Sequence, residues 1–329
     1  MRSTYPNTGK FLKKNKEGVA SVVGTIMALL IFLTILTIFV NTWMPVTLKE
    51  HERTHMDDVM NEFGTMKGSI DNMIIYTSLT GYPSSTVYQS VDLGAEGIPA
   101  FAAATAGLLT MNPYGTDSSR SYANFSVSTV AKSLSTGGSI EFYGPNRYYV
   151  QQWLAYENGA IILKQEDGQI VKATPGITFT IDSGTLNVNY YQISFYGQSD
   201  SASGTESTGV NMQVLAVDKI TYNPDANTDI KFTFISEYGQ AYFDYLNSTL
   251  GSMSGMANGG ISGWTFNSTD SFTYQNTGYS NTGSIFWKVS YEYLAQYDCY
   301  AVSLTIHNTP NKVSSISYSH AYVNFEISR

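Results

Sequence analysis

The chain has little charge and almost no cysteine. Only 13% of its 329 residues are Asp, Glu, Lys or Arg, about half the usual share in a globular protein. The single cysteine, Cys299, excludes an intramolecular disulfide framework and a zinc site built from several thiolates. The net charge is −8, and no cluster of Lys or Arg follows residue 60, which argues against a nucleic-acid partner.

Sequence signatures of catalysis are also scarce. The chain has no G-x-S-x-G elbow and no glycine-rich phosphate loop leading into a helix. One stretch, HERTH at residues 51–55, fits the H-E-x-x-H pattern of zinc peptidases. On a helix, that spacing would place His51 and His55 as zinc ligands with Glu52 beside them as the general base.

The longer zinc-peptidase pattern fails, because Asp58 stands where a glycine is required and Asn61 where the third histidine is required. Heptad counting from Met56 also places His51 and His55 off the apolar stripe, so we expect a charged, solvated helix segment here. The sequence therefore predicts no enzyme, no metal site and no cofactor, with an anchored zinc peptidase as a remote alternative.

The N-terminus predicts a membrane segment. A basic stretch, KFLKKNKE at residues 10–17, precedes VASVVGTIMALLIFLTILTIFV, which has no charge from Val19 to Val40. Twenty-two uncharged, mostly apolar residues are enough to span a bilayer as a helix, and the flanking lysines place residues 1–17 in the cytoplasm. The rest of the chain is then extracellular. An uncleaved anchor and a removed signal peptide are the alternatives, although no A-x-A-like site follows the apolar run.

The segment KKNKEGVASVVG (residues 13–24) resembles the leader of archaeal type IV pilin-like proteins, an uncharacterised subgroup of which is also similar at residues 137–173 and 231–250. The resemblance implies a class III leader at 1–18, cut by a prepilin peptidase between Gly18 and Val19. Residues 19–43 would then be a transmembrane or filament-core helix that self-assembles with other pilin-like subunits. The family brings no catalytic residues.

Residues 44–83 are expected to form an amphipathic stalk helix. Met56, Val59, Phe63, Met66, Ile70 and Met73 recur at alternating spacings of four and three, which predicts an apolar seam. Pro45 is expected to interrupt or kink the helix. The seam would pack on the protein's own β head; a dimeric coiled-coil stalk is the alternative.

Residues 84–329 predict an extracellular β-rich domain. Short β-branched and aromatic runs alternate with turns, including Asn158-Gly159 and Asp167-Gly168 as two-residue hairpin loops. One helix is expected at 236–250, and two Gly/Ser-rich loops at 197–209 and 251–263. The predicted fold class is α+β: a long hydrophobic-then-amphipathic N-terminal helix followed by a large antiparallel β-sandwich-like head.

Two kinds of site are indicated in this domain. Asn124, Asn247 and Asn267 begin N-x-S/T acceptors for N-glycosylation. Asp225, Asn227 and Asp229 alternate like the start of a calcium loop, but Ile230 and Ser236 stand where the loop needs Gly and Glu, so an Asx-rich turn is expected.

These features together predict a type IV pilin-like structural protein, either a subunit or a minor component of a surface filament or adhesion structure. The alternative is a permanently anchored extracellular binding module, whose leader would stay attached. His307 and His320 are expected to be lone polar strand residues.

Overall fold

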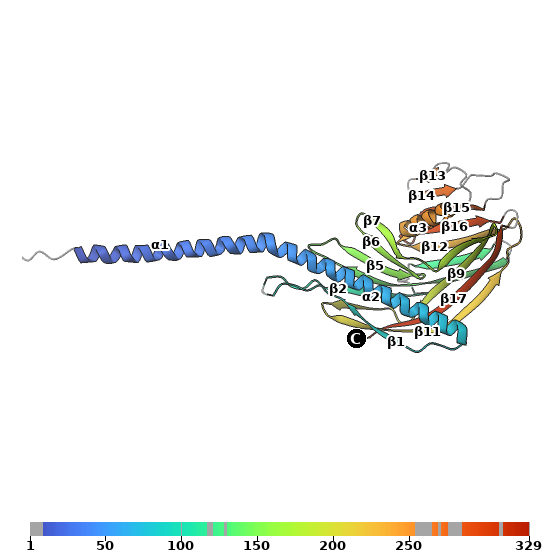
Figure 1. The fold of residues 1–329 in the computed structure, drawn as a ribbon, viewed down its shortest axis with the longest axis horizontal. Helices are drawn as coiled ribbons and strands as arrows, with labels where there is room; N and C mark the ends of the chain where they lie inside the picture. Colours follow the sequence, from blue (N-terminus) through green and yellow to red (C-terminus); the bar gives the residue numbers. More distant parts are fainter. Residues whose placement is uncertain are drawn as a thin grey trace, which may run out of the picture.

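A computed structural model describes residues 9–99, 101–116, 121–127, 130–253, 265–268, 271–275, 285–308 and 312–328. A helical rod leads into a β-rich head, as Figure 1 shows. The fold class is therefore α+β, as the sequence predicts.

The rod is one continuous helix. Helix α1 (Gly9–Ile38) passes into a π-helical turn, η1 (Phe39–Trp43), and then into α2 (Met44–Thr80) (Figure 1). The helix is not interrupted at Pro45, but the rod changes direction where α1 passes into α2 (Figure 1), which is the kink that the sequence allowed. Proline has no N–H to donate, and the wide turn just before it, closed by the Met44 N–H donating to the Phe39 carbonyl, accommodates the missing bond without ending the helix.

Helix α2 ends at a glycine. Gly81 adopts φ 74°, and its N–H donates to the Thr77 carbonyl at 2.9 Å. This left-handed cap is accessible to glycine without strain. It turns the chain back along the helix into the first strand.

A five-stranded sheet lies under α2. Its strands run in the order β1 (Val87–Asp92), β11 (Ser207–Tyr222), β17 (Val313–Ser328), β9 (Thr185–Tyr196) and β8 (Ile177–Asp182). The pairing of β17 with β9 is parallel, with Ile316 opposite Val188. The expected all-antiparallel head is wrong at this one pair among the described strand pairs.

The second sheet is larger. It includes β13 (Thr265–Ser268), β14 (Ser271–Gln275), β15 (Phe286–Leu294), β16 (Cys299–His307), β12 (Asp229–Ser236), β3 (Tyr122–Val127), β4 (Val130–Gly144), β5 (Gln152–Glu157), β6 (Ala160–Gln165) and β7 (Gly168–Ala173). Strand β2 (Gly107–Pro113) pairs with β4, and β10 (Asp200–Gly204) pairs with β2. The first half of β4 pairs with β3 and its second half with β2 and β5. One long strand thus joins two halves of the head.

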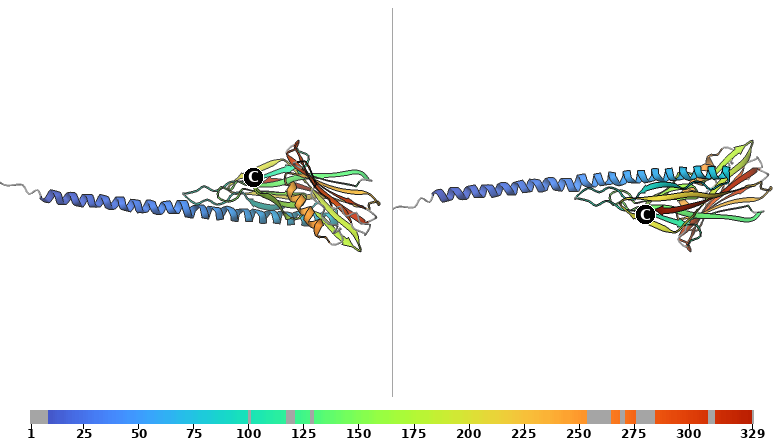
Figure 2. Two further views of the ribbon diagram at one scale, coloured as in Figure 1. Left: turned by 90° about the horizontal axis from the view of Figure 1, so that it is seen from above. Right: turned by 90° about the horizontal axis from the view of Figure 1, so that it is seen from below.

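Two apolar clusters form the core. In one, the seam residues of α2 pack with side chains from β1, β2, β4, β5, β9, β11 and β17. In the other, helix α3 (Gly239–Ser252) packs with β12, β15 and β16. The views in Figure 2 show α2 lying along the head while the N-terminal half of the rod projects beyond it. The seam therefore packs on the protein's own head, and no second chain is needed to cover it.

Most predicted strands and the helix at 236–250 are present, with local corrections. Asn158-Gly159 forms the predicted hairpin loop, with both residues at positive φ. The next loop is Glu166-Asp167, because Gln165 pairs with Gly168, so the predicted Asp167-Gly168 turn is one residue late. The loop expected at 197–209 contains β10, which pairs with β2. Residues 254–263 of the second loop lie outside the described residues.

Candidate functional site

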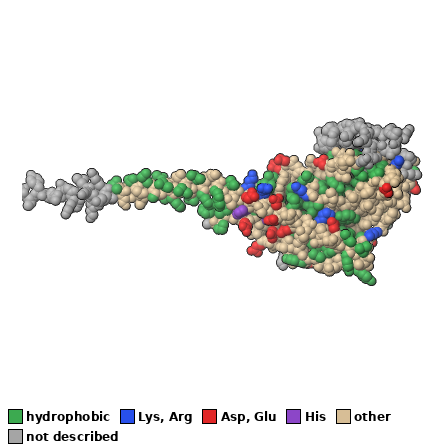
Figure 3. All heavy atoms as spheres, in the orientation of Figure 1, with side chains coloured by type: hydrophobic (Ala, Val, Ile, Leu, Met, Phe, Trp, Pro, Cys, Tyr) green, Lys and Arg blue, Asp and Glu red, His purple; other side chains and the backbone are tan. Residues whose placement is uncertain are grey.

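The apolar half of the rod has no cover within the chain. Fourteen large hydrophobic side chains between Val19 and Val46 are exposed, including Leu29 and Leu30 in the middle of the run. The helix from Gly18 contains an 18-residue window of mean hydropathy 2.7, none of which is buried. Figure 3 shows apolar side chains along this part of the rod. Its length and composition suit a membrane span or a signal sequence.

The predicted processing site lies on this helix. Gly18 and Val19 are both exposed and helical, and a Cβ added to Gly18 would meet no atom within 4 Å. The side chains of residues 9–17 lie outside the described part of the structure. Cleavage between Gly18 and Val19 stays a prediction.

The junction of rod and head is built on Glu52. Its side chain is 2% exposed, so the predicted solvated segment is wrong at this residue. Its carboxylate accepts hydrogen bonds from the backbone N–H groups of Arg147, Tyr148 and Tyr149, at 2.9, 2.7 and 2.7 Å, and from the Thr105 hydroxyl at 2.9 Å. Three successive N–H groups converging on one anion form a backbone nest, which ties the β4–β5 loop to α2.

The two histidines of the motif join the same junction. His51 Nδ1 lies 3.1 Å from the Glu96 carbonyl oxygen, and His55 Nε2 lies 3.1 Å from the Asp92 carbonyl oxygen. Both side chains are half-buried rather than fully solvated, and burial lowers the pKa of His55. Glu52 and both histidines form hydrogen bonds to the head, so in this chain the residues of the H-E-x-x-H motif hold the helix on the head. No group of three or more His, Cys, Asp or Glu among the described residues is arranged to hold a metal.

A cleft of about 450 Å³ opens beside these histidines. Its acidic lining includes Asp58, Asp92, Glu96 and Glu206. Nearby, Glu62 accepts the Asp92 N–H at 3.0 Å. Burial and the neighbouring Asp92 and Asp58 carboxylates raise the pKa of Glu62 to about 7, against the lowering effect of that hydrogen bond. The junction is thus acidic as well as tightly bonded.

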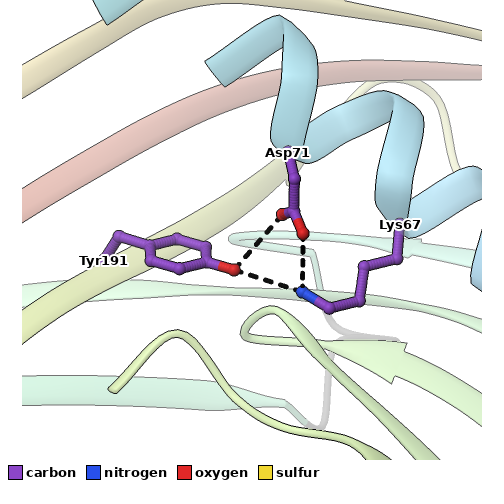
Figure 4. Close-up of polar contacts among 3 residues, drawn as sticks. All are labelled: Lys67, Asp71 and Tyr191. Carbon is purple, nitrogen blue, oxygen red and sulfur yellow. Dashed lines mark hydrogen bonds and ion pairs between the residues drawn. The ribbon is translucent and has the colours of Figure 1, made fainter. Parts of the chain in front are cut away.

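A second contact between α2 and the head lies further along the helix, where Lys67 and Asp71 meet Tyr191 of β9 (Figure 4). Lys67 Nζ lies 3.0 Å from Asp71 Oδ2 and donates to the Tyr191 hydroxyl at 3.1 Å, while that hydroxyl donates to Asp71 Oδ1 at 3.2 Å. Burial raises the pKa of Tyr191, so its hydroxyl stays neutral and available as a donor. The three groups form a closed triangle between the helix and β9.

We expect Tyr191→Phe to lower the free energy of unfolding by about 1 kcal/mol. The effect is modest because Lys67 and Asp71 keep their own ion pair. Denaturant titration of the full chain in detergent micelles measures it. Tyr143→Phe is the control, since that exposed hydroxyl donates only a 3.3 Å bond to Gln151. Equal losses in the two variants would show that the triangle adds nothing.

The calcium-like stretch forms a turn. Asn308 Nδ2 donates to the carbonyls of Pro224 and Asp225, and the Asn227 N–H donates to the Asn308 carbonyl. Asp229 lies 2.5 Å from His307 Nδ1. Asp225 and Asn227 therefore stand in the expected Asx-rich turn, and Asp229 begins β12 after it. His307 is paired with Asp229, so it is not the lone strand residue that the sequence predicts.

The glycosylation acceptors lie in different surroundings. Asn124 is half-exposed on β3, and its Nδ2 donates to Ser135 at 3.4 Å. Asn247 is half-buried on α3, with its Oδ1 buried and lacking a partner. Asn267 falls in β13, and its side chain lies outside the described part of the structure. Glycan occupancy stays a prediction at all three.

Sequence reasoning missed two buried polar contacts in the head. Ser194 Oγ lies 2.8 Å from His320 Nε2, and burial lowers the pKa of that imidazole to about 4. Ser194 is fully buried, so its hydroxyl is closed to a substrate. Glu157 is buried at the end of β5, where its carboxyl accepts the Ser236 hydroxyl at 2.5 Å. Neither pairing has a local signal, because the partners lie far apart in the sequence.

Searches of family models, curated proteins and solved structures found no match to this chain.

Proposed function

We propose that this chain is a type IV pilin-like cell-surface protein, a subunit or minor component of an extracellular filament or adhesion structure. The observation that carries the proposal is the division of one continuous helix. Its C-terminal half is docked on the head, whereas its N-terminal half exposes fourteen large apolar side chains. Such a surface must be covered by lipid or by other chains.

In this proposal the apolar half spans the membrane first, with the head outside. Removal of the leader after Gly18 then allows the same apolar surface to leave the bilayer and pack against equivalent helices of neighbouring subunits. Helix contacts replace lipid contacts, and the Glu52 junction keeps each head at a fixed position on its helix. A filament subunit needs a head that is fixed on its helix, because the packed helix then determines where the surface of the head lies on the filament.

The test is the N-terminal sequence and intact mass of the protein from native membranes and from sheared filaments. A chain that begins at Val19 in the filament fraction supports the proposal. A chain that keeps its leader and stays in the membrane contradicts it, and identifies a permanently anchored binding module instead.

We expect Gly18→Ile to abolish processing, because a peptidase that cuts after glycine must accommodate the side chain at that position. Gly24→Ile is the matched control: both glycines have open space around the Cβ position, so neither change disturbs the fold. Intact mass measures the outcome. Normal trimming of the Gly18 variant would count against prepilin-type processing.

A further inference from the structure

A narrow hairpin runs from the head along the rod. It joins β1 to β2, and its two arms are bridged at Ala95–Thr105 and at Ile98–Ala102, each through two backbone hydrogen bonds of 2.9–3.0 Å. At Gly97 a Cβ would lie 2.4 Å from the Ala102 carbonyl oxygen, so only glycine allows the arms to approach this closely. The hairpin is thus a defined structure.

Its base is fixed to α2 and its tip reaches the apolar half of the rod. At the base, Thr105 bonds to Glu52 and the Glu96 carbonyl to His51. At the tip, the ring of Phe101 lies 5.1 Å from that of Phe39. Phe39 precedes Glu52 by thirteen residues, about 20 Å along a helix that rises 1.5 Å per residue. The tip therefore stands where the apolar stretch Val19–Val40 of the helix ends.

The tip itself is apolar and exposed. No charge occurs between Glu96 and Asp117. Phe101 is 48% exposed although it is a large aromatic residue, and Pro99 and Ala103 are also exposed. Trp43, which is 52% exposed, belongs to the same group, since its ring stacks on Phe39 at 4.8 Å. Aromatic rings gather at this level of membrane helices, between acyl chains and water.

We propose that this hairpin tip is a second membrane contact, inserted into the interfacial layer of the outer leaflet beside the helix. The inference rests on the proposed function, in that the helix must first span the bilayer. Glu96 and Glu206, which line the cleft at the base of the hairpin, are acidic. The contact is therefore apolar and needs no anionic lipid. Together with the helix, it would fix the depth and rotation of the head at the membrane.

The test uses the full chain in phosphatidylcholine vesicles. In a Cys299→Ala background, single cysteines replace Phe101, Leu29 in the middle of the apolar run, or exposed Tyr297 of the head. A nitroxide on each cysteine reports collisions with oxygen, which enriches in lipid, and with a water-soluble nickel complex. We expect oxygen to dominate at position 29 and, less strongly, at position 101, whereas nickel dominates at position 297.

The labelled positions distinguish the proposed hairpin contact from the proposed helical anchor. If position 29 lies in lipid and position 101 in water, the hairpin contact is wrong and the helical anchor stands. If position 29 is also in water, both are wrong. If position 101 is shielded in assembled filaments but not in vesicles, a neighbouring subunit covers the tip and the lipid contact is overturned.

A second variant checks the chemistry of the contact. With the label at position 103, Phe101→Asp should move it into water, since a carboxylate resists the acyl region, while Phe101→Leu should keep it in lipid. A label at position 103 that both variants leave in lipid would contradict insertion by the aromatic tip.

Discussion

Replacing Glu52 with alanine is expected to lower the free energy of unfolding by about 3–5 kcal/mol. The change leaves the N–H groups of Arg147, Tyr148 and Tyr149 aimed at an empty space in a buried site. Each stranded donor costs about 1–3 kcal/mol. Thermal unfolding of the full chain in detergent micelles gives the size of the loss, and amide exchange in the β4–β5 loop shows where it arises.

Glu50→Ala is the matched control for this prediction. Glu50 lies two residues earlier on the same helix, with its side chain 64% exposed and paired only loosely, at 3.7 Å, with Arg53. We expect a change within about 0.5 kcal/mol there. Glu52→Gln should remain destabilising, because an amide presents an NH₂ group to a nest of N–H donors. Equal stability of the Glu50 and Glu52 variants would show that the junction does not depend on this carboxylate.

The importance of Glu52 could have been predicted from the heptad spacing. Glu52, Met56, Val59, Phe63 and Met66 follow the alternating spacing of four and three without a break. All five are buried. The charge of Glu52 favours solvent, whereas its place in the heptad spacing favours burial, and the structure buries it. Only the fold reveals the nest of N–H groups, since it comes from a loop about 95 residues further along.

The local pattern sufficed for elements with a short apolar or β-branched run between turn residues. The runs AIILKQ (160–165) and ITFTID (177–182) predict strands, and they form β6 and β8 residue for residue. The helix expected at 236–250 is α3, in which Tyr242, Leu246 and Leu250 are buried. Tyr238, expected on the same face, is buried at the N-cap, and Tyr245 is only half-buried. In each case the residues that face the core are close in sequence, so periodicity alone identifies them.

Elements made by pairing with distant partners were missed. β10, DSASG, has no large apolar side chain, and it is a strand because its backbone pairs with β2, about ninety residues earlier. The parallel pairing of β9 with β17 likewise joins strands more than a hundred residues apart. Strand propensity depends on such neighbours, so β10 has no signal in its own sequence. The parallel direction of the β9–β17 pairing has none either, although each of those two strands is predicted by its own residues.

Glu157 gives the second large prediction, a loss of stability as pH rises. Burial raises the pKa of its carboxyl to about 8 from an ordinary value near 4.5, and Glu141 adds to the rise, whereas bonds from Ser236, Ser121 and Tyr242 oppose it. Between those two pH values the folded chain holds a proton that the unfolded chain has lost. Stability from this group is complete below about pH 4.5 and falls through pH 8, by about 1.4 kcal/mol per pH unit at most.

Glu157→Gln should remove most of this dependence. The amide keeps an oxygen for the Ser236 hydroxyl, which in turn accepts the Tyr238 N–H at the start of α3. We expect the variant to be more stable than the natural chain at pH 9 and close to it at pH 5, measured by thermal unfolding in micelles. Glu166→Gln, at an exposed hairpin loop, controls for the charge and should leave the pH dependence unchanged. If the Glu157 variant shows the same pH dependence as the natural chain, Glu157 does not hold a proton in the folded chain that the unfolded chain has lost. The Ser236 contact would then hold a buried carboxylate at the start of α3.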